Sequence, residues 1–142
     1  ANQGYVNNCL HGRKIPEIIA HGRVSREEVT QALSNSDFSI LLRPSNERYT
    51  KAGFPTKSVE AMMNGCAMIC NLTSDLEMYL IDEKNSIIVE ECNSRAMTYA
   101  LRRVLSLNRK QIDEIKKNAN NTAKSYFDYH AWISDVRKFI ED

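Results

Sequence analysis

The sequence predicts an α/β fold, with a Rossmann-like parallel sheet, flanking helices and a helical C-terminal segment. Short apolar runs alternate with amphipathic stretches up to about residue 93, which is the pattern of successive βα units. The run Phe38–Leu42 is almost continuously apolar, as in a strand buried on both faces of a parallel sheet. The 142 residues are expected to form a single domain, 1–142, in which residues 94–142 are the helical C-terminal part.

The N-terminal part predicts one strand and one helix. Residues 1–14 are polar and weakly patterned, and Pro16 argues against a helix through that point. The segment "PEIIAHG" predicts a strand of about five residues. Ser25 and Glu28 form a capping box that predicts the start of a helix. Its core stripe is expected to consist of Val29, Ala32 and Leu33.

The middle of the chain predicts strands that alternate with helices. After the strand Phe38–Leu42, a loop leads into a helix that Gly65 ends in a left-handed conformation. Three more elements are expected: a buried strand in "CAMICNL", a short helix in "SDLEMYLID", and a shorter, more exposed strand in "SIIVEE". The apolar face of the first helix holds Val59, Met62 and Met63.

Three helices are expected after residue 94. The first follows from the spacing of Met97, Leu101, Val104 and Leu105. Asn108 and Gln111 form a variant capping box for the second, whose apolar stripe is Ile112, Ile115, Ala119 and Ala123. The third carries Trp132, Ile133, Val136 and Ile140. Its apolar face is expected to pack on the domain, with docking on a partner domain as the alternative.

Composition excludes several classes of function. With 19 basic and 18 acidic residues, the net charge of +1 creates no overall field that would attract nucleic acid. No segment is apolar enough to span a membrane. Cys66 and Cys70 are expected to be reduced core thiols, and the cysteine and histidine spacing does not fit a zinc site. Without a signal-peptide pattern, these features predict a cytoplasmic protein.

The stretch "AGFPTKSVEAM", residues 52–62, contains the candidate binding site. Ligands of open parallel sheets bind beyond the carboxyl ends of the strands, where the helices begin. A glycine loop that leads into a helix offers free N–H groups and a positive dipole to a phosphate, to which Lys57 adds a full charge. Arg43 and Ser45, at the end of the preceding strand, are expected to face the same crevice.

Glu60 requires a different explanation, because a phosphate repels a carboxylate. It fits if Glu60 accepts hydrogen bonds from the two hydroxyls of a ribose. A purely structural alternative stays open: Glu60 complements the helix dipole, Lys57 is solvated, and Gly53 with Pro55 shapes a turn.

Three segments resemble a known family. They are "GRVSREEVTQALSNSDFSILLRPS", "AGFPTKSVEAMMNGCAMI" and "SDLEMYLIDEKNSIIV". They are similar to the C-terminal, donor-binding half of the retaining group 1 glycosyltransferases, which include glycogen and sucrose synthases and bacterial surface-polysaccharide enzymes. The resemblance covers roughly residues 20–89 and implies one half of a two-domain GT-B architecture.

The resemblance implies roles for individual residues. Glu60 matches the glutamate that contacts the donor ribose, and Gly53 with Phe54 matches the segment that lies against the sugar and diphosphate. Backbone amides near Thr56 and Lys57 would hold the phosphates. No metal or other cofactor is expected, no general base is assigned, and the catalytic residues are left unknown.

The chain departs from the family pattern at three positions of this loop. Ala52 replaces a glutamate that grips the transferred sugar, so the sugar and the nucleotide are left open. Pro55 replaces a glycine and removes one N–H donor. Lys57 replaces an apolar residue and supplies a cation that offsets this loss.

These features predict the donor-binding part of a glycosyltransferase that moves a hexosyl group from a nucleotide-diphosphate sugar. The acceptor would be a saccharide or a lipid-linked saccharide, bound by a domain upstream of these 142 residues, and peripheral attachment to the inner face of the membrane is left open. This chain alone is expected to be inactive. The alternative is a non-catalytic nucleotide-binding or interaction module, for which the replacement at Ala52 is the main argument.

Overall fold

The computed structural model describes residues 3–11, 13 and 15–141, and the chain divides into two compact units. Unit 1 covers residues 1–32 and unit 2 covers residues 33–142. Unit 1 contains most of α2 (Arg26–Asn35) and also α1 (Gln3–Cys9), a helix that the weak pattern of residues 1–14 does not predict. All of the predicted site residues lie in unit 2.

Unit 1 confirms one sequence prediction and contradicts another. The capping box before α2 is present, since Ser25 N–H donates to Glu28 Oε2 at 2.8 Å and Glu28 N–H donates to Ser25 Oγ at 3.2 Å. The strand predicted in "PEIIAHG" is absent, and residues 15–24 form turns and irregular backbone. A strand needs a neighbouring strand that satisfies its backbone groups, and this segment is not one of the strands of the sheet β1-β2-β3.

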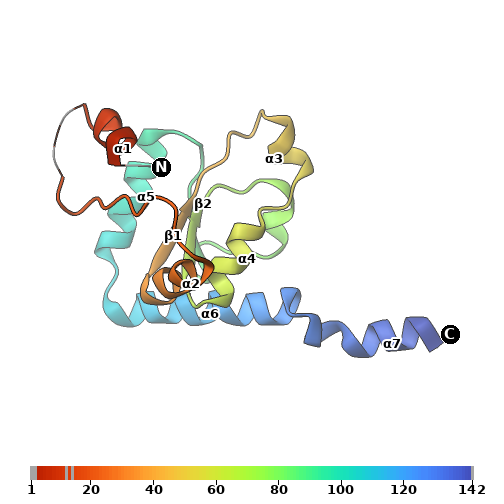
Figure 1. Cartoon of the computed structure of the whole chain (residues 1–142). Coiled ribbons are helices and arrows are strands. Elements are labelled where there is room, and N and C mark those ends of the chain that lie inside the picture. Colours follow the sequence, from red (N-terminus) through yellow and green to blue (C-terminus); the bar gives the residue numbers. More distant parts are fainter. Residues whose placement is uncertain (1–2, 12, 14, 142) are drawn as a thin grey trace. The chain divides into compact units, whose positions relative to one another are not determined.

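Unit 2 is built on a parallel sheet of three strands in the order β1-β2-β3 (Figure 1). The strands are β1 (Phe38–Leu41), β2 (Ala67–Cys70) and β3 (Ser86–Ile88). Ile40 pairs with Ile69, which pairs in turn with Ile87. This arrangement confirms the predicted parallel sheet.

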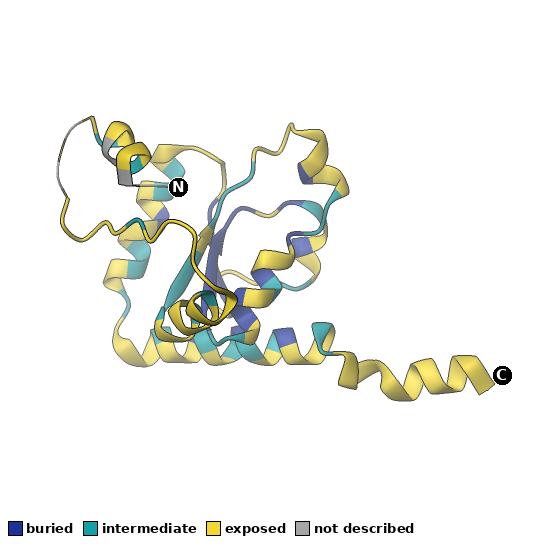
Figure 2. Ribbon diagram, in the orientation of Figure 1, coloured by how far each residue is buried: buried dark blue, intermediate teal, exposed yellow. Residues whose placement is uncertain are grey.

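Helices cover the central and last strands of the sheet. Both α4 (Thr56–Met63) and α6 (Arg109–Phe127) pack against β2 and against each other, and α5 (Ser94–Ser106) packs against β3. Every residue of β2 is buried, as predicted (Figure 2). As predicted, β3 is shorter and slightly more exposed than β2: Ile88 is half-buried, whereas Ser86 and Ile87 are buried because α5 and α6 cover the strand.

The first strand is less buried than its apolar sequence predicts. Its residues are half-buried except for Ile40, whose side chain is 56% exposed. Among the described residues, β1 has a neighbouring strand on one side only, so the run Phe38–Leu42 forms an edge and not the middle of the sheet. Its apolar composition is typical of strands covered on both faces.

Local signals set the ends of the helices in unit 2. Gly65 follows α4 with a φ of +74°, as predicted, a conformation that other residues rarely adopt. The capping box of α6 is confirmed, since Gln111 N–H donates to Asn108 Oδ1 at 3.0 Å and Asn108 N–H donates to Gln111 Oε1 at 2.9 Å. The predicted short helix in "SDLEMYLID" is the 3₁₀ helix η1 (Ser74–Met78).

The C-terminal helix does not pack on the sheet, which contradicts the prediction. After η2 (Tyr129–Trp132), helix α7 (Ile133–Glu141) has no buried residue (Figure 2). Val136 is 53% and Ile140 is 74% exposed. The main contact of α7 is with η2, so its apolar face has no covering surface among the described residues. No helix in the described part of the chain combines the length and the apolar character that crossing a membrane requires.

Two of the four cysteines belong to the core. Cys66 and Cys70 are buried free thiols, as predicted, whereas Cys9 and Cys92 are exposed free thiols. Burial raises the pKa of Cys70 to about 12 and raises that of Cys66 as well. Both core cysteines are therefore neutral thiols at pH 7 and poor nucleophiles.

Ion pairs connect the start of β1 to α6. The Asp37 carboxylate lies 3.0 Å from Lys116 Nζ and 2.9 Å from Arg109 Nη1. The hydrogen bond from Lys116, assisted by Arg109, holds the pKa of Asp37 below its ordinary value. Because the folded state depresses this pKa, the pairs stabilise the fold above the unfolded pKa of about 3.9, and the effect is lost as the pH falls through the folded pKa.

We therefore expect Asp37→Asn to destabilise the protein at pH 7 by less than about 1 kcal/mol, since the side chain of Asp37 is 38% exposed. The difference from the wild type should shrink below about pH 4, where the wild-type carboxylate takes up its proton. Urea unfolding at several pH values measures both effects. Asp135→Asn, on exposed α7, is the matched control. A difference that is constant from pH 7 to pH 3 would contradict the assignment.

Candidate functional site

The carboxyl ends of β1 and β2 are joined by one side chain. Asn71, which directly follows β2, accepts a hydrogen bond from Arg43 N–H at 2.9 Å and donates one to the Arg43 carbonyl at 2.7 Å. Asn71 is only 5% exposed. The Asn71 side chain therefore extends the hydrogen bonding between the two strands beyond their last paired residues, and it fixes the backbone where the chain leaves β1.

The side chain of Arg43 returns to the loop that follows β1. Its Nη1 donates to the Gly53 carbonyl at 2.8 Å and its Nη2 donates to the Tyr49 carbonyl at 2.7 Å. Its guanidinium carbon lies 5.6 Å from the centre of the Tyr49 ring. Two predicted site residues, Arg43 and Gly53, are thus in direct contact, at the end of the short helix α3 (Arg48–Ala52).

The start of α4 presents the predicted charges to solvent. Lys57 and Glu60 are both exposed, and their spacing of three residues places them on one face of the helix. Glu60 is the fifth residue of α4, so it lies in the second turn and not in the first. An ammonium and a carboxylate therefore stand one turn apart near the positive end of the helix dipole.

The backbone amides at this helix start are partly engaged. Thr56 is exposed, and its N–H donates to the Phe54 carbonyl at 3.0 Å. Ser58 N–H donates to the Pro55 carbonyl at 2.9 Å. A phosphate at this helix end would have to share or replace the bond of Thr56, which leaves the Lys57 side chain as the more accessible donor.

Phe54 lies in an aromatic cluster. Its ring centre is 5.9 Å from that of Tyr79 and 5.5 Å from that of Phe127, and the residue is half-buried. Such contacts add to the burial energy of the rings. Phe54 therefore attaches the glycine loop to η1 and α6, in addition to its predicted place beside the sugar.

Ser45 lines a cavity beyond the carboxyl ends of the strands. The cavity has a volume of about 410 Å³, within the range of small-molecule sites. The sequence singled out only Ser45 among its lining residues, because the others come from loops after β1, β2 and β3 that the topology brings together. They are Pro44, Asn46, Asn71, Leu72, Glu90, Glu91, Cys92 and Asn93.

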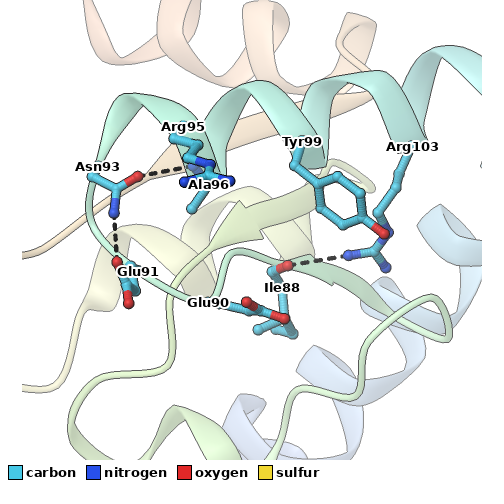
Figure 3. Close-up of a pocket in the computed structure, with 8 residues that line it drawn as sticks. All are labelled: Ile88, Glu90, Glu91, Asn93, Arg95, Ala96, Tyr99 and Arg103. Atoms are coloured by element: carbon cyan, nitrogen blue, oxygen red, sulfur yellow. Dashed lines mark hydrogen bonds between the residues drawn. The ribbon is translucent and has the colours of Figure 1, made fainter.

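A second cavity, of about 460 Å³, lies between β3 and α5 (Figure 3). Arg95, Tyr99 and Arg103 line it from α5, and their four-residue spacing is the signal that could have identified this face. One of its charged lining residues is paired within the protein, since Arg103 contacts Asp82 and Glu83 at 2.7 Å, and Asn93 donates to Glu91 at 2.6 Å. The remaining lining residues are Ile88, Glu90 and Ala96.

Three buried hydroxyls have no hydrogen-bond partner in the part of the chain that the structure describes. They are Thr50 Oγ1, Ser58 Oγ and Thr73 Oγ1, which belong to α3, α4 and the residue before η1. An unsatisfied buried hydroxyl costs about 1–3 kcal/mol. In the sequence, Thr50 and Ser58 lie on either side of the glycine loop Gly53–Pro55, whereas Thr73 follows β2.

Comparisons with known proteins identify the family and the fold of this chain. The sequence profile of "Glycosyl transferases group 1" matches residues 9–122, more than half of the chain. In structure, the chain is similar to sucrose-phosphate synthase from Thermosynechococcus elongatus, with a TM-score of 0.72 and 18% sequence identity. The match covers 98% of this chain but only 32% of that one, so this chain spans about a third of its length. No curated protein sequence matches significantly. With its Rossmann-like half of a GT-B fold, this chain belongs to the group 1 glycosyl transferases.

Proposed function

We propose that this chain is the donor-binding part of a cytoplasmic, retaining glycosyltransferase that takes a sugar from a nucleotide-diphosphate sugar. The acceptor would be a saccharide or lipid-linked saccharide held by another part of the protein. One observation carries the proposal: Lys57 and Glu60 stand exposed on one face at the start of α4, directly after the loop Gly53–Pro55. In a group 1 transferase, this is where an anionic donor would meet the helix.

The local charge supports an anionic ligand. Between residues 43 and 60 lie four cations, Arg43, Arg48, Lys51 and Lys57, against two carboxylates, Glu47 and Glu60. The whole chain carries a net charge of only +1. The basic surplus is therefore concentrated in the segment that follows β1, which favours a ligand such as a diphosphate at this place.

The two exposed charges would act on different parts of the donor. As the glycosidic bond to the diphosphate breaks, negative charge grows on the leaving group, and the Lys57 ammonium at the helix start would stabilise it. The Glu60 carboxylate, one turn further along α4, would accept hydrogen bonds from the ribose hydroxyls. This division keeps the carboxylate away from the phosphates.

The position of Ala52 favours an altered contact with the sugar. Ala52 is the last residue of α3 and is exposed, so its methyl group provides no hydrogen bond to a sugar hydroxyl. We infer that the transferred sugar is held without the carboxylate that the family pattern has at this position.

Titration of the chain with UDP-, GDP- and CMP-linked sugars, followed by NMR, tests the proposal. We expect one nucleotide series to perturb the backbone signals of residues 53–60. If none of the three series perturbs these signals, although the NMR spectrum shows a folded domain, the result would instead support the non-catalytic interaction module that Ala52 suggests.

A further inference from the structure

We propose that Arg43 is a positioning residue that holds the donor-binding loop in place, and that it does not itself contact the diphosphate. That the loop binds a nucleotide donor rests on the proposed function, but the structural role of Arg43 in holding the loop does not. Arg43 lies two residues after the end of β1, and the Asn71 side chain binds both its N–H and its carbonyl. The guanidinium therefore extends from a rigid base at the end of the sheet.

The guanidinium binds both ends of the last turn of α3. It contacts the Tyr49 carbonyl at 2.7 Å and the Gly53 carbonyl at 2.8 Å. The Tyr49 carbonyl also accepts the Gly53 N–H at 3.2 Å, so it receives two donors. Carbonyls at a helix C-terminus carry partial negative charge and favour such a cation. A planar guanidinium can bind two carbonyls at once, which a lysine ammonium at this distance could not do in the same way.

The backbone is tightly packed around Gly53. A Cβ atom there would lie 3.1 Å from the Tyr49 carbonyl oxygen and 3.9 Å from Arg43 Nη2. The first distance is too short for ordinary packing, so a larger residue would push against the carbonyl that Arg43 binds. Gly53 and Arg43 thus form one unit, three residues before the start of α4.

The position of the loop determines where the candidate ligand groups stand. From Gly53 the chain passes through Phe54 and Pro55 into Thr56 and Lys57 at the helix start. The half-buried ring of Phe54 and the Arg43 contacts hold this short segment from two sides. Loss of the guanidinium would release α3 and the glycine while leaving the strand pairing through Asn71 intact.

Hydrogen exchange of the unliganded chain tests the role of Arg43 without any nucleotide. In Arg43→Ala, we expect the amides of Thr50 and Gly53, which donate within α3, to exchange at least about tenfold faster. Arg43→Lys should give a similar increase, because one ammonium cannot replace the two-carbonyl contact. Arg48→Ala, an exposed residue of the same helix, should leave exchange unchanged and serves as the control. Unchanged exchange in both Arg43 variants would overturn the proposal.

Binding measurements then separate positioning from direct contact. If Arg43 positions the loop, Arg43→Lys should weaken a nucleoside and its diphosphate by the same factor. If it touched the diphosphate, only the diphosphate would be affected, and the proposal would be wrong. A wild-type chain that binds no nucleotide would contradict the proposed function, whereas the exchange result would still decide whether Arg43 holds the loop.

Discussion

Replacing Glu60 with glutamine is expected to weaken the binding of the matching nucleoside about 10- to 150-fold. The range corresponds to the loss of about 1.5–3 kcal/mol, typical of hydrogen bonds to a charged group. Replacing Lys57 with alanine should weaken the nucleoside diphosphate by a comparable factor and should leave the nucleoside almost unaffected. Isothermal titration with the nucleoside and its diphosphate measures both effects. The difference follows from the geometry of α4, where the two exposed charges stand one turn apart.

Two controls make this pair of variants informative. Asp135→Asn removes an exposed carboxylate of α7, and Lys138→Ala removes an exposed cation of the same helix. Each changes the net charge as the test variant does, without touching the start of α4. If Glu60→Gln and Lys57→Ala weakened both ligands equally, or if the controls had the same effect, the division of roles between the two residues would be refuted.

Replacing Asn85 with alanine is expected to destabilise unit 2 by about 2–5 kcal/mol, because the buried amide of Asn85 makes three hydrogen bonds that are lost together. Asn85 is 4% exposed, and its Oδ1 accepts the Ile81 N–H at 2.7 Å. Its Nδ2 donates to the Tyr79 carbonyl at 2.8 Å and to Thr122 Oγ1 at 2.9 Å. One amide group thus connects the segment after η1, the start of β3 and the middle of α6.

Urea unfolding measures this effect as a lower midpoint with an unchanged slope. Asn46→Ala, at an exposed position in the loop after β1, is the matched control and should change stability by less than about 0.5 kcal/mol. A loss below about 1 kcal/mol for Asn85→Ala would mean that water replaces the amide group and that the packing of α6 does not depend on it.

Features with a local cause could be predicted from the sequence. The capping boxes at Ser25 and Asn108 each involve a side chain and a backbone three residues away, so their spacing alone predicts them. The left-handed end of α4 follows from Gly65 for the same reason. The Lys57 and Glu60 pair also belongs to this group, since position along one helix determines that they share a face.

Features that depend on distant partners could not be predicted. The segment "PEIIAHG" has the composition of a strand, but composition does not supply the neighbour with which a strand must pair. The burial of Ile87 depends on two helices that follow it in the chain. The position of Arg43 at the end of a strand could be predicted. Its contacts with Tyr49 and Gly53 could not, because they depend on how the loop after β1 folds back toward the Arg43 side chain. The sequence therefore locates the candidate site better than it explains how that site is held.

The open side of β1 has a consequence for the behaviour of the protein in solution. Among the described residues, this strand pairs only with β2, and Ile40 on it is 56% exposed. An unpaired, apolar edge is a template onto which another extended chain can add. A net charge of +1 provides little electrostatic repulsion between copies. Within unit 2, the side of β1 that does not pair with β2 is therefore the place where a further extended segment would add to the sheet.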